Sequence, residues 1–184
     1  VLRHGLAMGA NRAILIEKIQ KDRLDNLLPK LMSKNEIDMW IIITREYNED
    51  PIIKTLLPPT WHNARRRTIL VFSYNELTNK TESVAISRYN FGNKIKSIWD
   101  KEKTPNQLMA LKEYIKTKNP KNIGLNYSEN FPLVDGISKT DYELFYNSMS
   151  PEIKKKIVSA ENLGIQWIET RTELEKKIYK DLVR

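Results

Sequence analysis

Apolar residues follow helical spacing near the start of the chain. Leucines recur at the i, i+3, i+4, i+7 positions of one helix face, namely Leu24, Leu27, Leu28 and Leu31. The pattern predicts an amphipathic helix from about Arg12, and Pro29 should kink or restart it because proline has no backbone N–H to donate. Residues 1–10 show no such periodicity, so residues 1–11 are interpreted as a leader outside the fold.

Strands are indicated by a different pattern. The segment Asp38–Thr44 is a nearly continuous apolar run, which is typical of a central strand that is covered on both faces. Arg67–Ser73 and Ser83–Ser87 predict two further strands, joined by a polar loop as an antiparallel hairpin. Lys121–Asn126 predicts another strand. Helices and strands that alternate in this way favour a layered α/β domain.

Capping residues mark the later helices. Thr104, followed by Pro105 and Gln107, predicts a helix that runs to about Lys118. Three further residues are candidate caps: Ser138, Ser159 and Thr172. The last of these forms a capping-box pattern with Glu175, three residues later.

Charge is spread evenly along the chain. The 184 residues include 31 Lys and Arg against 23 Asp and Glu, a net charge of +8. Residues 1–92 carry 14 basic against 10 acidic residues and residues 93–184 carry 17 against 13, so each half has an excess of four. The only dense basic runs are Arg65–Arg67 and Lys154–Lys156. No basic tail or lobe results, which argues against a dedicated nucleic-acid binder.

Other function classes are also disfavoured by composition. The longest apolar run, Met39–Ile43, is far shorter than the ~20 residues of a membrane-spanning helix, so no membrane association is expected. The chain has no cysteine, which leaves the compartment open between cytoplasm and periplasm. Its only imidazoles, His4 and His62, have no ligand at metal-site spacing, and no glycine-rich phosphate loop or Gly-x-Ser-x-Gly elbow occurs.

The most unusual local chemistry follows the buried strand. Arg45, Tyr47 and Asn48 come directly after it, and ligands of open α/β sheets favour loops at the carboxyl ends of strands. These side chains can meet a carboxylate or a peptide backbone, and Arg45 offers a bidentate fork. A helix cap with a local salt bridge explains the same residues and stays open as the alternative. Trp61 is a loop aromatic that fits either loop packing or an interface.

Several segments, taken in order, carry a resemblance to a known family. They are Leu27–Met32, Ile37–Ile42, Arg45–Pro51, Ala64–Phe72, Ile123–Asn126, Asp135–Ile137, Val158–Glu161 and Trp167–Thr172. Together they resemble the amino-terminal domain of bacterial Xaa-Pro aminopeptidase-like proteins. These belong to the creatinase, prolidase and aminopeptidase P family of metallopeptidases. The resemblance spans about residues 20–184.

This resemblance implies a fold and a domain organisation. Residues 12–171 are expected to form a three-layer α/β/α domain with a mixed sheet of the ribonuclease H type. Residues 172–184 are expected to begin the helix that leads to a catalytic domain outside this chain. In the family that domain holds two divalent metal ions (manganese, cobalt or zinc) on Asp, Asp, His, Glu and Glu ligands. None of these ligands matches a position here, so no catalytic, cofactor-binding or metal-binding residue is assigned.

The resemblance also implies a role. In the family the amino-terminal domain shapes oligomers and walls the cleft for short proline-containing peptides. Arg45, Tyr47, Asn48, Trp61 and Arg65 therefore become candidate cleft or interface residues. The expected partners are the protein's own catalytic domain and further copies of the chain. The full-length protein is expected to be an Xaa-Pro aminopeptidase or dipeptidase, and this chain alone is not an enzyme. A nucleic-acid-binding α/β domain and a free-standing small-molecule enzyme are the alternatives.

Overall fold

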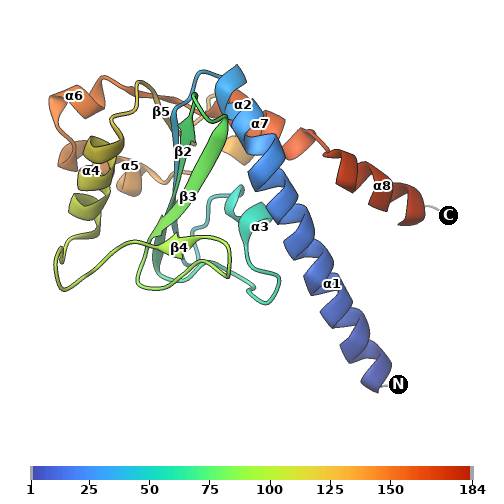
Figure 1. Cartoon of the computed structure of the whole chain (residues 1–184). Coiled ribbons are helices and arrows are strands. Elements are labelled where there is room, and N and C mark those ends of the chain that lie inside the picture. Colours follow the sequence, from blue (N-terminus) through green and yellow to red (C-terminus); the bar gives the residue numbers. More distant parts are fainter. Residues whose placement is uncertain (1, 183–184) are drawn as a thin grey trace.

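A mixed six-stranded sheet forms the centre of the computed structural model, which describes the backbone of residues 2–182 and the side chains of residues 11–180 (Figure 1). The strands are β1 (Met39–Arg45), β2 (Arg67–Asn75), β3 (Lys80–Ile86), β4 (Lys96–Ser97), β5 (Ile123–Leu125) and β6 (Ile157–Ser159). Their order across the sheet is β4-β3-β2-β1-β5-β6. β1, β2 and β3 are antiparallel neighbours, whereas β5 and β6 continue the sheet in parallel and β4 pairs in parallel with β3.

Eight α-helices accompany the sheet in the described part of the chain. They are α1 (Leu2–Asp22), α2 (Leu28–Lys34), α3 (Ile53–Leu56), α4 (Gln107–Lys118), α5 (Lys139–Ser148), α6 (Pro151–Lys154), α7 (Glu161–Glu169) and α8 (Glu173–Leu182). A π-helical turn, Arg23–Leu27, and a 3₁₀ turn, Pro132–Val134, are also present. The end of α1, with α2, α3 and α7, lies on one side of the sheet, and α4, α5 and α6 lie on the other (Figure 1). The predicted α/β class with a mixed sheet is confirmed.

The central strand β1 supplies side chains to two hydrophobic cores. Trp40 and Ile42 pack with α2, α3 and α7, and Met39, Ile41 and Ile43 pack with α4 and α5. Successive side chains of a strand point to opposite faces of the sheet, which explains the alternation. The prediction of a central strand covered on both faces is confirmed, as are the β2–β3 hairpin and β5. The short strands β4 and β6 carry no alternating pattern and were not predicted.

The first helix differs from the expectation. α1 begins at Leu2, ten residues before the predicted start at Arg12, so the segment interpreted as a leader has helical backbone. The Ala, Leu, Met and Arg residues of this segment favour a helix through their intrinsic propensity. The predicted start rested on apolar periodicity, which this segment lacks. The expected break at Pro29 is present: a π-helical turn, Arg23–Leu27, separates α1 from α2. Its wider spacing accommodates a residue that cannot donate a backbone hydrogen bond.

Capping was predicted correctly at two helices and misplaced at two others. Ser138 Oγ accepts the Asp141 N–H at the start of α5, and Thr172 and Glu175 form the expected capping box of α8. At α4 the cap is Asn106 rather than Thr104, because the Asn106 side chain accepts from two backbone N–H groups. At α7 the N-cap is Ala160, and the Oγ of Ser159 accepts the N–H of Glu161 from one position earlier.

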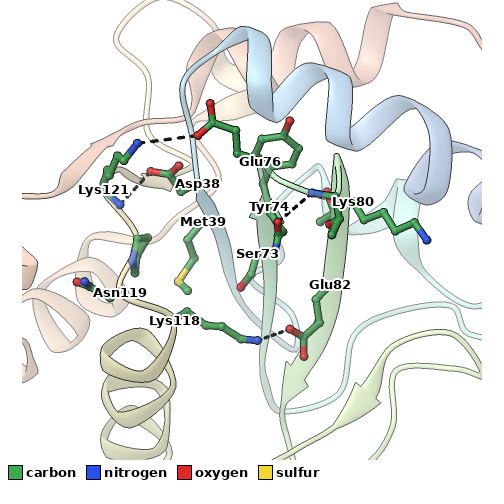
Figure 2. Close-up of a pocket in the computed structure, with 14 residues that line it drawn as sticks. Asp38, Met39, Ser73, Tyr74, Glu76, Lys80, Glu82, Lys118, Asn119 and Lys121 are labelled. Atoms are coloured by element: carbon green, nitrogen blue, oxygen red, sulfur yellow. Dashed lines mark hydrogen bonds and ion pairs between the residues drawn. The ribbon is translucent and has the colours of Figure 1, made fainter.

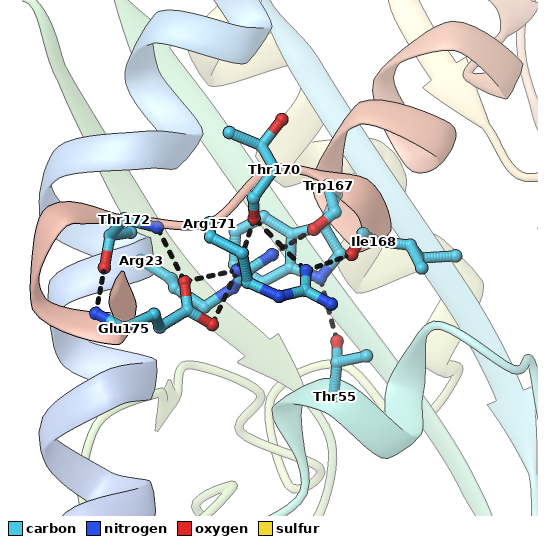
Figure 3. Close-up of polar contacts among 8 residues, drawn as sticks. All are labelled: Arg23, Thr55, Trp167, Ile168, Thr170, Arg171, Thr172 and Glu175. Atoms are coloured by element: carbon cyan, nitrogen blue, oxygen red, sulfur yellow. Dashed lines mark hydrogen bonds and ion pairs between the residues drawn. The ribbon is translucent and has the colours of Figure 1, made fainter. Parts of the chain in front are cut away.

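Arg23 connects the first helices to the start of α8 (Figure 3). Its guanidinium donates to the carbonyl oxygens of Trp167 and Thr170 and to both carboxylate oxygens of Glu175, at 2.8 and 3.1 Å. The group also lies 4.4 Å from the centroid of the Trp167 ring. The Arg23 and Glu175 side chains are 8% and 14% exposed, so water screens little of this ion pair. Arg23 therefore fixes where α8 leaves the domain.

Arg23→Met tests this anchor. The substitution keeps most of the side-chain volume but leaves the Glu175 carboxylate and two carbonyl groups without their donor. Breaking a buried ion pair is expected to lower the free energy of unfolding by about 3 kcal/mol. Lys21→Met, which removes an exposed ion pair with Asp25, is the matched control and should change little. Urea unfolding measures both variants, and equal losses would contradict the assignment.

Candidate functional site

Two arginines stand directly opposite each other at one end of the sheet. Arg45 is the last residue of β1 and Arg67 is the first residue of β2, and the antiparallel register pairs them. Directly opposed residues on antiparallel strands point to the same face, where like charges are destabilising. The fold therefore holds two cations together and has to offset their repulsion.

Each of these guanidinium groups has its own partner. Arg45 Nε lies 2.8 Å from Oδ2 of Asp141, a residue of α5 that is 2% exposed, and Arg45 also donates to Ser138 Oγ at 3.3 Å. Arg67 Nε donates to Oε1 of Gln107 at 2.9 Å. The side-chain amide of Gln107 in turn donates to the Arg67 carbonyl oxygen and to a carbonyl of β3. The first residue of α4 thus fixes the position of Arg67.

A pocket of about 520 Å³ opens beside this pair of arginines. It is lined by Arg45, Arg66, Arg67, Arg88, Tyr89, Trp99, Pro105, Asn106 and Gln107, and is called the arginine pocket below. Arg66 and Arg88 are exposed. Of the four arginines, only Arg45 has a salt bridge to a carboxylate of the described residues. The backbone N–H of Arg66 donates to Oε2 of Glu46 at 3.2 Å. The pocket combines guanidinium groups with two aromatic rings, which is the chemistry of an anion site.

The loop after β1 presents Tyr47 to solvent. Arg45 and Asn48 exchange backbone hydrogen bonds of 3.3 and 3.0 Å, which close a tight turn. Inside it Tyr47 has a φ of 66°, a left-handed conformation that is unfavourable for a bulky side chain. The Tyr47 side chain is 92% exposed, and Asn48 is exposed as well. No packing contact therefore explains why an aromatic residue occupies this strained position.

Trp61 and Arg65 form a second, neighbouring cluster. The Arg65 guanidinium lies 4.7 Å from the centroid of the Trp61 ring, which packs edge-on against Tyr89 and Phe91 at 5.8 and 5.3 Å. Trp61 is partly buried and lines a groove of about 670 Å³ together with residues of α1 and α8. This groove is separate from the arginine pocket. The sequence candidates thus fall into two groups, Arg45 in one depression and Trp61 in another, with Tyr89 between them.

Asp50 is buried at the base of the loop that carries Tyr47. Its side chain accepts from the Ile52 N–H and from the Asn126 side-chain amide, both at 2.8 Å, and Asn126 accepts from Trp40 Nε1 at 2.7 Å. Burial raises the pKa of Asp50 to about 6, although both hydrogen bonds favour the charged form. A side chain at Gly136 has no room, because its Cβ would lie 2.2 Å from the Asp50 carboxyl carbon. Asp50 therefore joins the loop after β1 to β5 and to the sheet.

A third depression lies at the opposite end of the sheet and has a different electrostatic character (Figure 2). Lys118 pairs with Glu82, and Lys121 lies 4.0 Å from Glu76. The carboxylate of Asp38 accepts the backbone N–H groups of Lys121 and Asn122, both at 2.9 Å. Two of the three lysines that line this depression, Lys118 and Lys121, thus have a carboxylate partner, whereas Lys80 has no salt bridge among the described residues.

The described residues contain neither a cluster of metal ligands nor a membrane-spanning helix. Among these residues, no group of three or more His, Cys, Asp or Glu side chains could hold a metal ion. No helix that the structure describes is long and apolar enough to cross a membrane.

Comparison with known proteins adds no relative: no family model, no curated protein and no solved structure matches the chain.

Part of the site was visible in the sequence and part was not. The run Arg65–Arg67 was noted as a basic run, and Arg45 was a candidate residue. Arg88 and Trp99 were not predicted as site residues, and Gln107 was predicted only as part of a helix start. The predicted hairpin contained a usable signal, because an antiparallel pair brings the start of its first strand to the end of its second and so brings Arg88 towards Arg67.

Substitution of Arg45 should lower the free energy of unfolding, whereas substitution of Arg66 should not. Arg45→Gln leaves the Ser138 hydroxyl as the main remaining side-chain partner of the buried Asp141 carboxylate. The free energy of unfolding should therefore fall by about 2 kcal/mol. This loss is smaller than the full cost of a broken buried pair, because the Arg45 side chain is 38% exposed. Arg66→Gln should leave stability nearly unchanged. Chemical denaturation of the two variants makes the comparison. A large loss in Arg66→Gln would show that its side chain is structural.

The buried Asp50 carboxyl should make the stability of the fold depend on pH. Its pKa in the folded state, about 6, exceeds the ordinary value of 3.8, so ionisation opposes folding above pH 6 and the penalty is relieved as the pH falls towards 4. The stability of the parent relative to Asp50→Asn, which does not titrate, should therefore rise from pH 7 to pH 4. Denaturation curves at several pH values measure this difference. A difference that does not vary with pH would contradict the raised pKa.

Proposed function

We propose that this chain is the noncatalytic amino-terminal domain of a dimetal Xaa-Pro peptidase, in which it contributes a wall of the cleft for short proline-containing peptides. The ordered segments that resemble the creatinase, prolidase and aminopeptidase P family support this proposal. The sheet supports it as well, because the resemblance implies a mixed sheet and the chain has an antiparallel β1–β2–β3 meander continued by parallel strands beyond β1.

The observation that carries the cleft assignment is the turn Arg45–Asn48. It holds an exposed tyrosine in a left-handed conformation at the carboxyl end of the central strand. Strained backbone conformations that no packing contact stabilises are found preferentially at functional sites. A solvent-exposed aromatic ring offers a flat apolar surface for the proline ring of a peptide.

The groove lined by Trp61 supports a contact with a further domain. It also includes Tyr179 of α8, which is 61% exposed, and Arg171 just before that helix. The resemblance places the catalytic domain after α8. Trp61 and Arg65 therefore stand where the two domains would meet, and a second copy of the chain would complete the oligomer expected for the family.

The first test is catalysis with and without the proposed second domain. The 184-residue chain, given manganese, cobalt or zinc and Xaa-Pro peptides, should release no amino acid, because its described residues contain no dimetal ligand set. The coding sequence after Arg184 should continue into the Asp, Asp, His, Glu and Glu ligands, and the full-length protein should release the amino acid. A stop codon after Arg184, or metal-dependent turnover by the chain alone, contradicts the proposal.

Tyr47→Ala in the full-length protein tests the cleft assignment. Losing one contact in the transition state should lower kcat/KM by about tenfold, which corresponds to ~1.4 kcal/mol. Stability should not fall, since the side chain is 92% exposed. Leu77→Ala, which removes a 98% exposed side chain at the other end of the sheet, is the matched control and should leave kcat/KM unchanged. Equal activity of both variants would exclude Tyr47 from the cleft.

A further inference from the structure

The arginine pocket concentrates positive charge that the chain does not neutralise. Arg66, Arg67 and Arg88 line it without a salt bridge to any carboxylate of the described residues, and only Arg45 has one, to Asp141. The lysine-lined depression at the opposite end of the sheet shows the contrast, because two of its three lysines, Lys118 and Lys121, have a carboxylate partner (Figure 2). A cluster of like charges opposes folding unless something else is bound to it.

The residues that surround these cations are held in place. Gln107 accepts from Arg67 Nε, and Arg66 has a φ of 50° with its carbonyl oxygen bound to the Glu46 N–H at 2.7 Å. The ring of Trp99 is oriented by a 2.7 Å hydrogen bond from its Nε1 to the Thr104 carbonyl. Arg88 lies two residues after the end of β3. The guanidinium groups therefore come from three segments, the end of β1, the start of β2 and the residues after β3, and meet at one opening.

The charge and size of the pocket define the ligand. Guanidinium groups bind carboxylate and phosphate oxygens bidentately. Three unpaired cations exceed the single charge of a carboxylate and match a group that carries two or three negative charges. The volume of about 520 Å³ falls within the range of small-molecule sites. The start of α4, capped by Asn106, faces the same opening and adds the positive end of a helix dipole.

We infer that the arginine pocket binds a phosphate-type oxyanion of two or more charges, either free or as the terminal group of a small molecule. An extended nucleic acid fits less well, because it needs a continuous basic track and the remaining charge is spread evenly over both halves of the chain. This inference does not rest on the proposed peptidase role. A peptide carboxylate carries only one charge, so a separate ligand is assigned to this pocket.

Calorimetric titration of the 184-residue chain with inorganic diphosphate tests the inference. In about 0.1 M salt we expect one site with a Kd below about 1 mM. The double variant Arg66→Gln, Arg88→Gln should bind at least about tenfold more weakly, because two charge-assisted contacts are lost. The control Lys18→Gln, Lys116→Gln loses the same charge from exposed positions outside the pocket and should bind within about twofold of the parent.

Three further ligands decide the nature of the anion. Inorganic phosphate should bind more weakly than diphosphate, and a nucleoside diphosphate that binds more tightly than diphosphate would identify the terminal group of a larger molecule. Acetate should not displace diphosphate at equal concentration. Displacement by acetate, no diphosphate binding by the parent, or unchanged binding by the arginine double variant would each overturn the inference.

A nucleic-acid site is a distinct outcome of the same experiment. If an oligonucleotide binds more tightly than diphosphate at the same salt, and the arginine double variant abolishes that binding, the small-anion assignment is wrong. Thermal melting checks that each variant is folded. Should the double variant fail to fold, Arg88→Glu provides the same test with one exposed side chain, and undiminished diphosphate binding by that variant would also overturn the inference.

Discussion

The opposed pair of Arg45 and Arg67 is the constraint around which this end of the domain is organised. The register of β1 and β2 places two positive charges side by side, an arrangement that is unfavourable by itself. It is tolerated because Asp141 neutralises the first and Gln107 accepts a hydrogen bond from the second. These partners come from α5 and α4, so the helices on this face of the sheet support the site as well as the hydrophobic core.

The buried strand β1 connects the two hydrophobic cores to the arginine pair at its carboxyl end. Its side chains fill both cores up to Ile43, and only its last two residues, Thr44 and Arg45, are polar. The loop that follows is then held by the Asp50 hydrogen bonds, which keep Tyr47 exposed in a strained turn. At the other side of the molecule, Arg23 performs a comparable task for α8. Two buried polar networks therefore position the surfaces to which we assign function.

Much of the fold follows from local sequence, and most of the site does not. The doubly covered strand, the hairpin and the capping box of α8 were predictable because periodicity and capping act over a few residues. The helical start of α1 and the short strands β4 and β6 were missed, since neither has a distinctive pattern.

The arginine pocket depends on contacts between segments that are distant in sequence. Gln107 was read as part of a capping box, whereas its side chain binds β2 and β3 across the face of the sheet. Arg45 was predicted as a cleft or interface candidate with a local salt bridge as the alternative, and its pairing with a buried aspartate gives it a structural role. Such roles are set by tertiary packing, which a pattern along one segment does not record.

Amide chemical-shift mapping is the most direct test of whether the carboxyl end of β1 is the ligand-facing end of the domain. In a titration of the isotope-labelled chain with diphosphate, the amide signals of Arg67, Arg88 and Gln107 should move together and saturate at a common concentration. The signals of Lys118 and Lys121, at the opposite end of the sheet, should stay in place. If only the signals of Lys118 and Lys121 move, anions bind at the opposite end of the sheet, and the assignment of this site is contradicted.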